Sequence, residues 1–103
     1  MSSSLSGLQP WLQPYARYLV ALAPVVRVTS VRRSRSEQAY LYRRFLAGES
    51  QYPVAPPGQS LHEYGRAFDV KAPRQLLNDL GHIWEQMGGR WGGRGGDPIH
   101  FEA

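Results

Sequence analysis

Two short segments of the chain combine histidine with acidic residues in patterns that suit metal binding. The first contains His62 and Asp69, and the second contains Asp97 and His100. The chain has no cysteine, so disulfide bonds, cysteine zinc fingers and a cysteine nucleophile are excluded. Imidazole nitrogens and carboxylate oxygens remain as metal ligands, and zinc accepts both. Any metal site in this protein must therefore be built from histidine, aspartate and glutamate.

Both segments have the alternation of β-strands with one apolar face. In residues 66–70, Asp69 lies on the face opposite the larger apolar side chains. In residues 98–102, His100 and Glu102 likewise lie on the face opposite the apolar side chains. An aspartate in a strand fit for burial is costly unless it is paired or binds a metal. If the two strands pair, Asp69 can meet His100, and Glu102 can support a ligand from behind.

His62 can reach the same place through a turn. Gly65 follows it and permits a backbone conformation that residues with a Cβ resist. Such a turn would fold His62 back beside Asp69. Together with His100, two imidazoles and one carboxylate form a set typical of catalytic zinc, which leaves a fourth position for water.

Asp97 lies in a Gly-Asp-Pro turn just before the last strand, so strand alternation does not fix its direction. A carboxylate that leans toward a metal site can take a proton from water and later deliver it to a leaving amine. Other interpretations stay open from residue types alone: Asp69 can pair with an arginine, and Asp97 can serve an ordinary turn. The third histidine, His82, lies in a predicted helix without an acidic partner, and we interpret it as a surface or capping residue.

The elements that must position these residues follow from apolar spacing and from helix and strand signals. Helices are predicted over residues 10–23, from Ser34 or Ser36 to about 47, and over 73–87, with strands near 25–31, 66–70 and 98–102. This order predicts a small single α+β domain. We expect an antiparallel sheet that carries the zinc site, with helices packed on its other face. Residues 1–8 are rich in serine and predict a flexible lead to a domain formed by residues 9–103.

Size and charge are those of one ordinary domain. The chain has 103 residues, a 42% apolar fraction and a formal net charge of +4. The longest apolar run is broken by Pro24 and is too short to span a bilayer. The first residues lack the basic and apolar regions of a cleavable signal peptide. We therefore expect a monomer that is made in the cytoplasm, spans no membrane and has no cleavable signal.

The segment Ser60-x-His62-x-x-Gly65-x-Ala67-x-Asp69 resembles the SxHxxGxAxD signature of the zinc-dependent D-alanyl-D-alanine carboxypeptidase family (peptidase family M15). This family includes VanY-like carboxypeptidases and phage L-alanyl-D-glutamate endopeptidases. Residues 97–102 resemble its (D/E)-x-x-H-F segment, residues 90–93 its RWGG stretch and residues 29–38 its TSGYRS-x-x-EQ segment. Val31 and Arg32 stand where that last segment has glycine and an aromatic residue.

The resemblance implies a function and roles for named residues. It implies Zn2+ bound by His62, Asp69 and His100, Asp97 as general base, and Arg33 as a cation that stabilises an oxyanion or holds a carboxylate. Residues expected at the substrate rim are Ser60, Tyr64 and Trp91.

The predicted activity is hydrolysis of peptidoglycan stem peptides, with the cell wall as the site of action, as in a phage or prophage lysin. An endopeptidase that cuts between L-alanine and D-glutamate is the first hypothesis, and a D-alanyl-D-alanine carboxypeptidase with the same site is the second. The positive charge favours approach to an anionic wall. A different class, a basic module that binds nucleic acid or cell wall, would use the arginines around residues 32–44; we expect no nucleic-acid partner.

Overall fold

The computed structural model describes residues 3–103. Within them the chain forms one four-stranded antiparallel sheet with the order β1-β2-β4-β3. The strands are β1 (Arg27–Ser30), β2 (Ala67–Lys71), β3 (Arg90–Trp91) and β4 (His100–Glu102). The helices are α1 (Gln13–Ala21), α2 (Arg35–Leu46) and α3 (Arg74–Gln86), with short 3-10 helices η1 (Leu5–Gly7), η2 (Leu61–Tyr64) and η3 (Gly92–Gly95). The predicted α+β class is confirmed.

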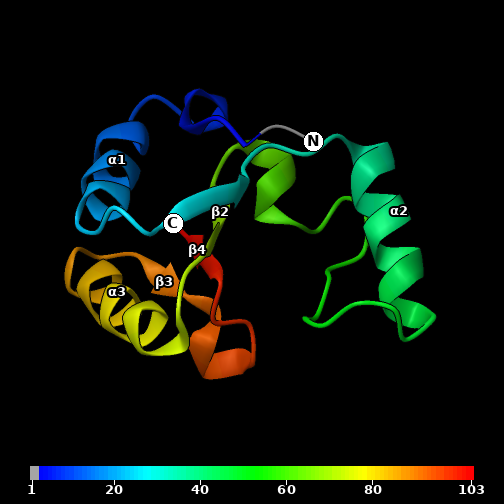
Figure 1. The fold of residues 1–103 in the computed structure, drawn as a ribbon. Helices are drawn as coiled ribbons and strands as arrows, with labels where there is room; N and C mark the ends of the chain where they lie inside the picture. The colour runs from blue at the N-terminus through cyan, green and yellow to red at the C-terminus, as the bar shows by residue number, and fades with distance from the viewer. Residues whose placement is uncertain (1–2) are drawn as a thin grey trace.

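The hydrophobic core lies between the sheet and the pair α1 and α3, which Figure 1 shows together on one side. Phe68 and Val70 of β2 and Phe101 of β4 point into this layer and are at most 1% exposed. Phe68 stacks on Phe101 with ring centroids 5.5 Å apart, and Trp84 of α3 meets both rings edge to face. Each such aromatic pair contributes about 0.5–1.5 kcal/mol beyond area burial. Strand alternation then leaves the neighbouring polar residues on the opposite face.

Helix α2 lies apart on that opposite side (Figure 1). Ser34 caps it: the Ser34 hydroxyl accepts from the Glu37 N–H at 3.1 Å, and the Glu37 carboxylate accepts from the Ser34 N–H at 2.9 Å. This reciprocal capping box selects Ser34 over Ser36 and explains why the helix begins at residue 35. The one buried residue of α2 is the polar Gln38. Helix α2 is thus attached to the domain by little apolar contact, unlike α1 and α3.

Helix α1 buries a narrower face than its apolar spacing predicts. Ala16 and Leu19 are buried, whereas Trp11, Tyr15 and Tyr18 are each more than half exposed. Apolar residues are common on protein surfaces, so apolar spacing alone does not identify the buried stripe.

The predicted lead is partly packed. Leu8 is 3% exposed and Leu5 of η1 packs against the core. The Gln9 N–H donates to the Gly65 carbonyl at 2.9 Å, which ties this segment to the turn after η2. The packed structure therefore begins before residue 9, while residues 1–2 lie outside the described part.

The glycine-rich segment after α3 contains a short strand where only a connection is predicted. β3 pairs with β4, with Arg90 opposite Glu102 and Trp91 opposite Phe101. A two-residue strand has no alternation to detect, so the sequence alone does not reveal it. Among residues 3–103, no helix has the length and apolarity that crossing a membrane requires.

Gly81 of α3 is the contact point for Trp91. A Cβ built on Gly81 would lie 2.1 Å from the indole ring, which is itself fixed because its N–H donates to the Pro98 carbonyl at 2.8 Å. We expect Gly81→Ala to lower the free energy of unfolding by about 1–3 kcal/mol through overpacking, although alanine favours helices by about 1 kcal/mol. Urea denaturation measures this change.

The control is Asp79→Ala, at an exposed position of the same helix. It should change stability by no more than about 0.5 kcal/mol. A Gly81→Ala variant that is more stable than wild type would contradict the packing described for Trp91.

Candidate metal centre

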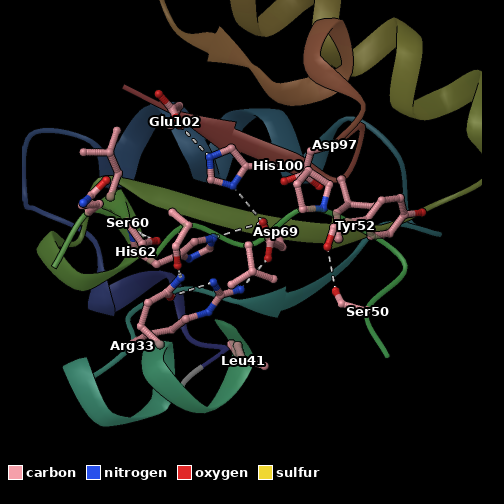
Figure 2. Close-up of a pocket in the computed structure, with 17 residues that line it drawn as sticks. Arg33, Leu41, Ser50, Tyr52, Ser60, His62, Asp69, Asp97, His100 and Glu102 are labelled. Carbon is pink, nitrogen blue, oxygen red and sulfur yellow. Dashed lines mark hydrogen bonds and ion pairs between the residues drawn. The ribbon is translucent and has the colours of Figure 1, made fainter. Parts of the chain in front are cut away.

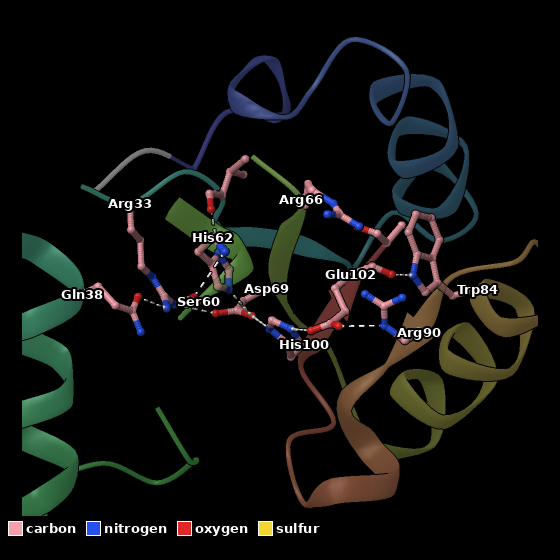
Figure 3. A network of polar contacts seen from close by, with 12 residues as sticks. Arg33, Gln38, Ser60, His62, Arg66, Asp69, Trp84, Arg90, His100 and Glu102 are labelled. Carbon is pink, nitrogen blue, oxygen red and sulfur yellow. Dashed lines mark hydrogen bonds and ion pairs between the residues drawn. The ribbon is translucent and has the colours of Figure 1, made fainter. Parts of the chain in front are cut away.

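Three side chains from separate segments converge on the sheet face that points away from the core. His62 comes from η2, Asp69 from β2 and His100 from β4, and one ligand atom of each lies within 4.8 Å of the others. The Oδ1 atom of Asp69 lies 3.1 Å from Nε2 of His62 and 3.2 Å from Nδ1 of His100 (Figure 3). The convergence expected from the strand pattern is therefore present.

Sheet pairing and a turn produce this convergence. β2 and β4 are antiparallel neighbours with Asp69 directly opposite His100. Gly65 ends η2 at φ +67°, and a Cβ there would meet the Gly7 carbonyl oxygen at 2.9 Å. Ser60 caps η2, since its hydroxyl accepts from the His62 N–H at 3.2 Å. The left-handed turn after η2 places His62, which is 2% exposed, beside Asp69.

Both imidazole rings are held from behind by hydrogen-bond acceptors. Nδ1 of His62 donates to the Val31 carbonyl at 2.6 Å, because a carbonyl can only accept. Nε2 of His100 donates to the Glu102 carboxylate at 2.7 Å. The neutral form of each ring therefore turns a lone pair toward Asp69. Two nitrogen lone pairs and a carboxylate oxygen that face one another require a positive charge between them, which either a proton or a metal ion can supply.

The pKa values of Asp69 and His100 also reflect the need for positive charge between these atoms. Burial opposes the charge on Asp69, yet hydrogen bonds from His100 and His62 hold the pKa of this carboxyl well below its usual range. Burial likewise disfavours a charged His100, but its hydrogen bonds with Asp69 and Glu102 raise its pKa to about 9. Two nitrogens and one carboxylate oxygen also match the three protein ligands of a catalytic zinc site. The residues present thus fit a divalent cation such as zinc.

Arg33 contacts the second oxygen of Asp69. Its Nη2 donates to Asp69 Oδ2 at 2.9 Å, its Nε to the Ser30 hydroxyl at 3.1 Å and its Nη1 to the Gln38 side-chain oxygen at 3.1 Å. Burial lowers the pKa of its guanidinium from the usual value, and Asp69 opposes that shift. In this structure Arg33 fixes Asp69 so that Oδ1 points toward the histidines.

Gln38 is a site residue that the sequence reasoning missed. Its amide nitrogen donates to the Ala55 carbonyl at 2.8 Å, so the side chain links Arg33 to the loop between α2 and η2. A glutamine that is 1% exposed in an otherwise polar helix is unusual. The available signal was its place in the Glu-Gln pair of the motif that contains Arg33.

Asp97 is positioned by the glycine-rich segment. Its N–H donates to the Gly92 carbonyl at 2.9 Å, and a Cβ on Gly92 would lie 2.5 Å from the Asp97 carbonyl oxygen. Its Oδ1 is the buried side-chain polar atom without a hydrogen-bond partner within residues 3–103. Burial raises the pKa of this carboxyl to about 6. An unsatisfied carboxylate oxygen with a raised pKa is suited to accept a proton.

A cleft of about 460 Å³ contains all these groups (Figure 2). Its lining includes the three candidate ligands, Arg33, Asp97, Ser60 and Glu102, together with Gln38 and Leu41 of α2 and residues 50, 52–55 and 59 of the loop that follows. The sheet face that carries the candidate ligands therefore forms the cleft's floor, and α2 with its loop forms one wall.

Two of the predicted rim residues do not line this cleft. Tyr64 is 44% exposed, and its hydroxyl donates to the Gly58 carbonyl at 2.9 Å. Trp91 packs on Gly81 and donates to the Pro98 carbonyl, so it supports the turn that contains Asp97. His82 is exposed and meets Trp91 edge to face, away from the candidate ligands.

Comparison with known proteins shows which solved structures share the fold of this chain. No family model and no curated protein matches the chain. A mutant of the vancomycin resistance D,D-pentapeptidase VanY, in complex with Zn(II), matches it with a TM-score of 0.70 and 17% sequence identity over 92% of this chain and 71% of that one. The Serratia marcescens L-Ala D-Glu endopeptidase ChiX matches with a TM-score of 0.68 and 24% identity over 95% and 81% of the two chains.

A third structure, VanYB in complex with D-alanine-D-alanine, matches with a TM-score of 0.62 and 19% identity over 92% and 70% of the chains. The chain has the fold of these peptidases. The likeness extends over nearly the whole of it, so the predicted fold relationship is confirmed.

The candidate ligands predict stoichiometric zinc binding. We expect one equivalent of Zn2+ to bind, and to raise the free energy of unfolding by about 2.7 kcal/mol when free zinc exceeds the dissociation constant 100-fold. His100→Ala, at the less buried of the two histidine ligands, should abolish that stabilisation. Metal analysis and thermal unfolding with and without zinc measure both effects.

The matched control is His82→Ala, which removes the remaining histidine and should bind zinc like wild type. Equal zinc binding by His100→Ala and His82→Ala would contradict the assignment of the site.

Proposed function

We propose that this protein is a zinc peptidase that hydrolyses peptidoglycan stem peptides, and that it cuts the bond between L-alanine and D-glutamate. The observation that carries the proposal is the His62–Asp69–His100 cluster with Asp97 beside it in one cleft. The shared fold with VanY and ChiX supports the substrate class. The net charge of +4 favours approach to an anionic cell wall.

In this proposal His62, Asp69 and His100 hold the zinc ion. Bound zinc supplies Lewis acidity, which polarises a carbonyl group and makes a water molecule more acidic. The chain's own residues prepare the ligand atoms: Val31 and Glu102 orient the two imidazoles, and Arg33 orients the carboxylate. Rigid ligands lose little freedom on binding, which favours affinity.

Asp97 is the proposed general base. Its unpaired Oδ1 can accept a proton from the attacking water, whose oxygen forms a new bond to the scissile carbonyl carbon. As the carbon–nitrogen bond breaks, Asp97 returns that proton to the leaving amine. The peptide is thereby split into an acid and an amine, and the carboxylate is regenerated.

Arg33 is proposed to act through Asp69. All three of its guanidinium nitrogens donate to protein groups, namely Ser30, Gln38 and Asp69. These three contacts support a positioning role for Arg33. The guanidinium has five N–H donors, so two remain for the substrate contact that the resemblance implies, and Arg33 lines the cleft.

The choice of bond has a specific support. ChiX is an L-Ala D-Glu endopeptidase and is 24% identical in sequence to this chain, against 17% and 19% for the two VanY structures. The higher identity supports the endopeptidase hypothesis. D-alanyl-D-alanine carboxypeptidase activity in the same cleft is the alternative, because VanYB binds D-alanine-D-alanine.

Incubation of the zinc-loaded protein with peptidoglycan tests the activity and the bond together. An endopeptidase releases peptides that begin with D-glutamate, whereas a carboxypeptidase releases free D-alanine; mass spectrometry of the soluble products distinguishes them. A chelator should abolish release, and added zinc should restore it. Unchanged muropeptides in the zinc-loaded sample would refute the proposal.

Asp97→Asn tests the general base. The amide keeps the size of the side chain but cannot take a proton, so we expect the rate of cleavage to fall about 100- to 10,000-fold. Zinc binding should persist, because Asp97 is not one of the candidate ligands. Asp79→Asn on the exposed face of α3 is the control, and a fully active Asp97→Asn variant would refute the assignment.

A further inference from the structure

The two candidate histidine ligands have different partners behind them. His62 donates to a main-chain carbonyl, a neutral acceptor that any residue at position 31 would supply. His100 donates to the side chain of Glu102, an acceptor that a single substitution can remove. The two rings are therefore not supported in the same way.

Strand geometry places Glu102 behind His100. The residues lie two apart on β4, so their side chains share one face, and the distance from Nε2 to Oε1 is 2.7 Å. The other carboxylate oxygen of Glu102 accepts from Nε of Arg90 at 2.9 Å, and β3 places Arg90 directly opposite Glu102 (Figure 3). Each oxygen of Glu102 thus has its own donor.

The main chain at this position is held independently of the side chain. The Glu102 carbonyl accepts from the Trp84 indole N–H at 2.9 Å, and Phe101 beside it is fully buried in the core. A change of the Glu102 side chain should therefore leave β4 and the position of His100 Cα in place. The carboxylate can be tested apart from the fold.

A carboxylate in this position has two effects on an imidazole ligand. It keeps the proton on Nε2, which leaves the lone pair on Nδ1 directed toward Asp69, and its negative charge makes the ring a stronger electron donor. Arg90 fixes the direction of the carboxylate. Glu102 contacts His100 at Nε2 and not at the Nδ1 that faces Asp69, so it is a positioning residue.

We infer that Glu102, braced by Arg90, selects the His100 tautomer and sets the affinity of the cluster for zinc. This inference rests on the zinc site proposed above. It gives Glu102 a role in zinc affinity and adds Arg90, from the strand β3 that the sequence did not reveal, to that site.

The test measures zinc affinity by competition with a chromophoric chelator. Glu102→Gln, which keeps an acceptor but loses the charge, should weaken binding about 10-fold, and Glu102→Ala should weaken it further, toward about 100-fold. Arg90→Ala should have a smaller effect in the same direction. Thermal unfolding of the metal-free variants checks that each one folds.

The chain offers a matched control pair. Arg94 and Glu85 form a similar ion pair, with side-chain exposures of 68% and 25% against 61% and 25% for Arg90 and Glu102, but they contact no candidate ligand. Glu85→Gln and Arg94→Ala should bind zinc like wild type. A general loss of surface charge would instead affect both pairs equally.

A spectroscopic signature separates tautomer selection from packing. In the zinc-loaded wild type, two-dimensional proton–nitrogen NMR should show a slowly exchanging His100 proton on Nε2, and Glu102→Ala should accelerate its exchange. Zinc binding that is unchanged in Glu102→Gln and Glu102→Ala would overturn this inference alone. A wild-type protein that binds no zinc would overturn it together with the proposed zinc site.

Discussion

A buried carboxylate that faces two imidazole lone pairs is the constraint on which the rest of the site depends. Asp69 is 7% exposed and would be strongly destabilising without compensating charge. Arg33 neutralises one of its oxygens, and the other faces the histidines. The hydrogen bonds behind both rings direct their lone pairs to the centre, where a proton or a metal cation must supply positive charge. The site is therefore a cluster of acceptor atoms that favours a bound cation.

The hydrophobic core and this cluster of acceptor atoms lie on opposite faces of the same strands. The aromatic layer of Phe68, Phe101 and Trp84 fixes β2 against β4, and the resulting register sets Asp69 opposite His100. Stability and ligand geometry thus depend on the same pairing. The turn at Gly65 and the glycine-rich segment after α3 add His62 and Asp97 to this frame.

Sequence reasoning predicted the features that depend on local pattern. Alternation indicated which way Asp69 and His100 point, and the order of helices and strands gave the fold class. It failed where geometry depends on distant partners: β3 exists only through its pairing with β4, and the half-exposed Tyr15 shows that apolar spacing does not identify the buried stripe. The sequence did not indicate that Gln38 belongs to the site, because its burial depends on the loop that packs over it. The role of Arg33 likewise follows from three partners that no spacing reveals.

The weak apolar attachment of α2 has a consequence for how this scaffold can change. The floor of the cleft is the outer face of the strands whose other face forms the core. Helix α2 and the loop after it are joined to this floor through polar contacts, among them those of Gln38 and the Arg35–Glu63 ion pair. Substitutions, insertions or deletions in that wall would reshape what the cleft accepts with little cost to folding. The scaffold thus separates the part that can diversify toward new peptides from the part that must stay constant for chemistry.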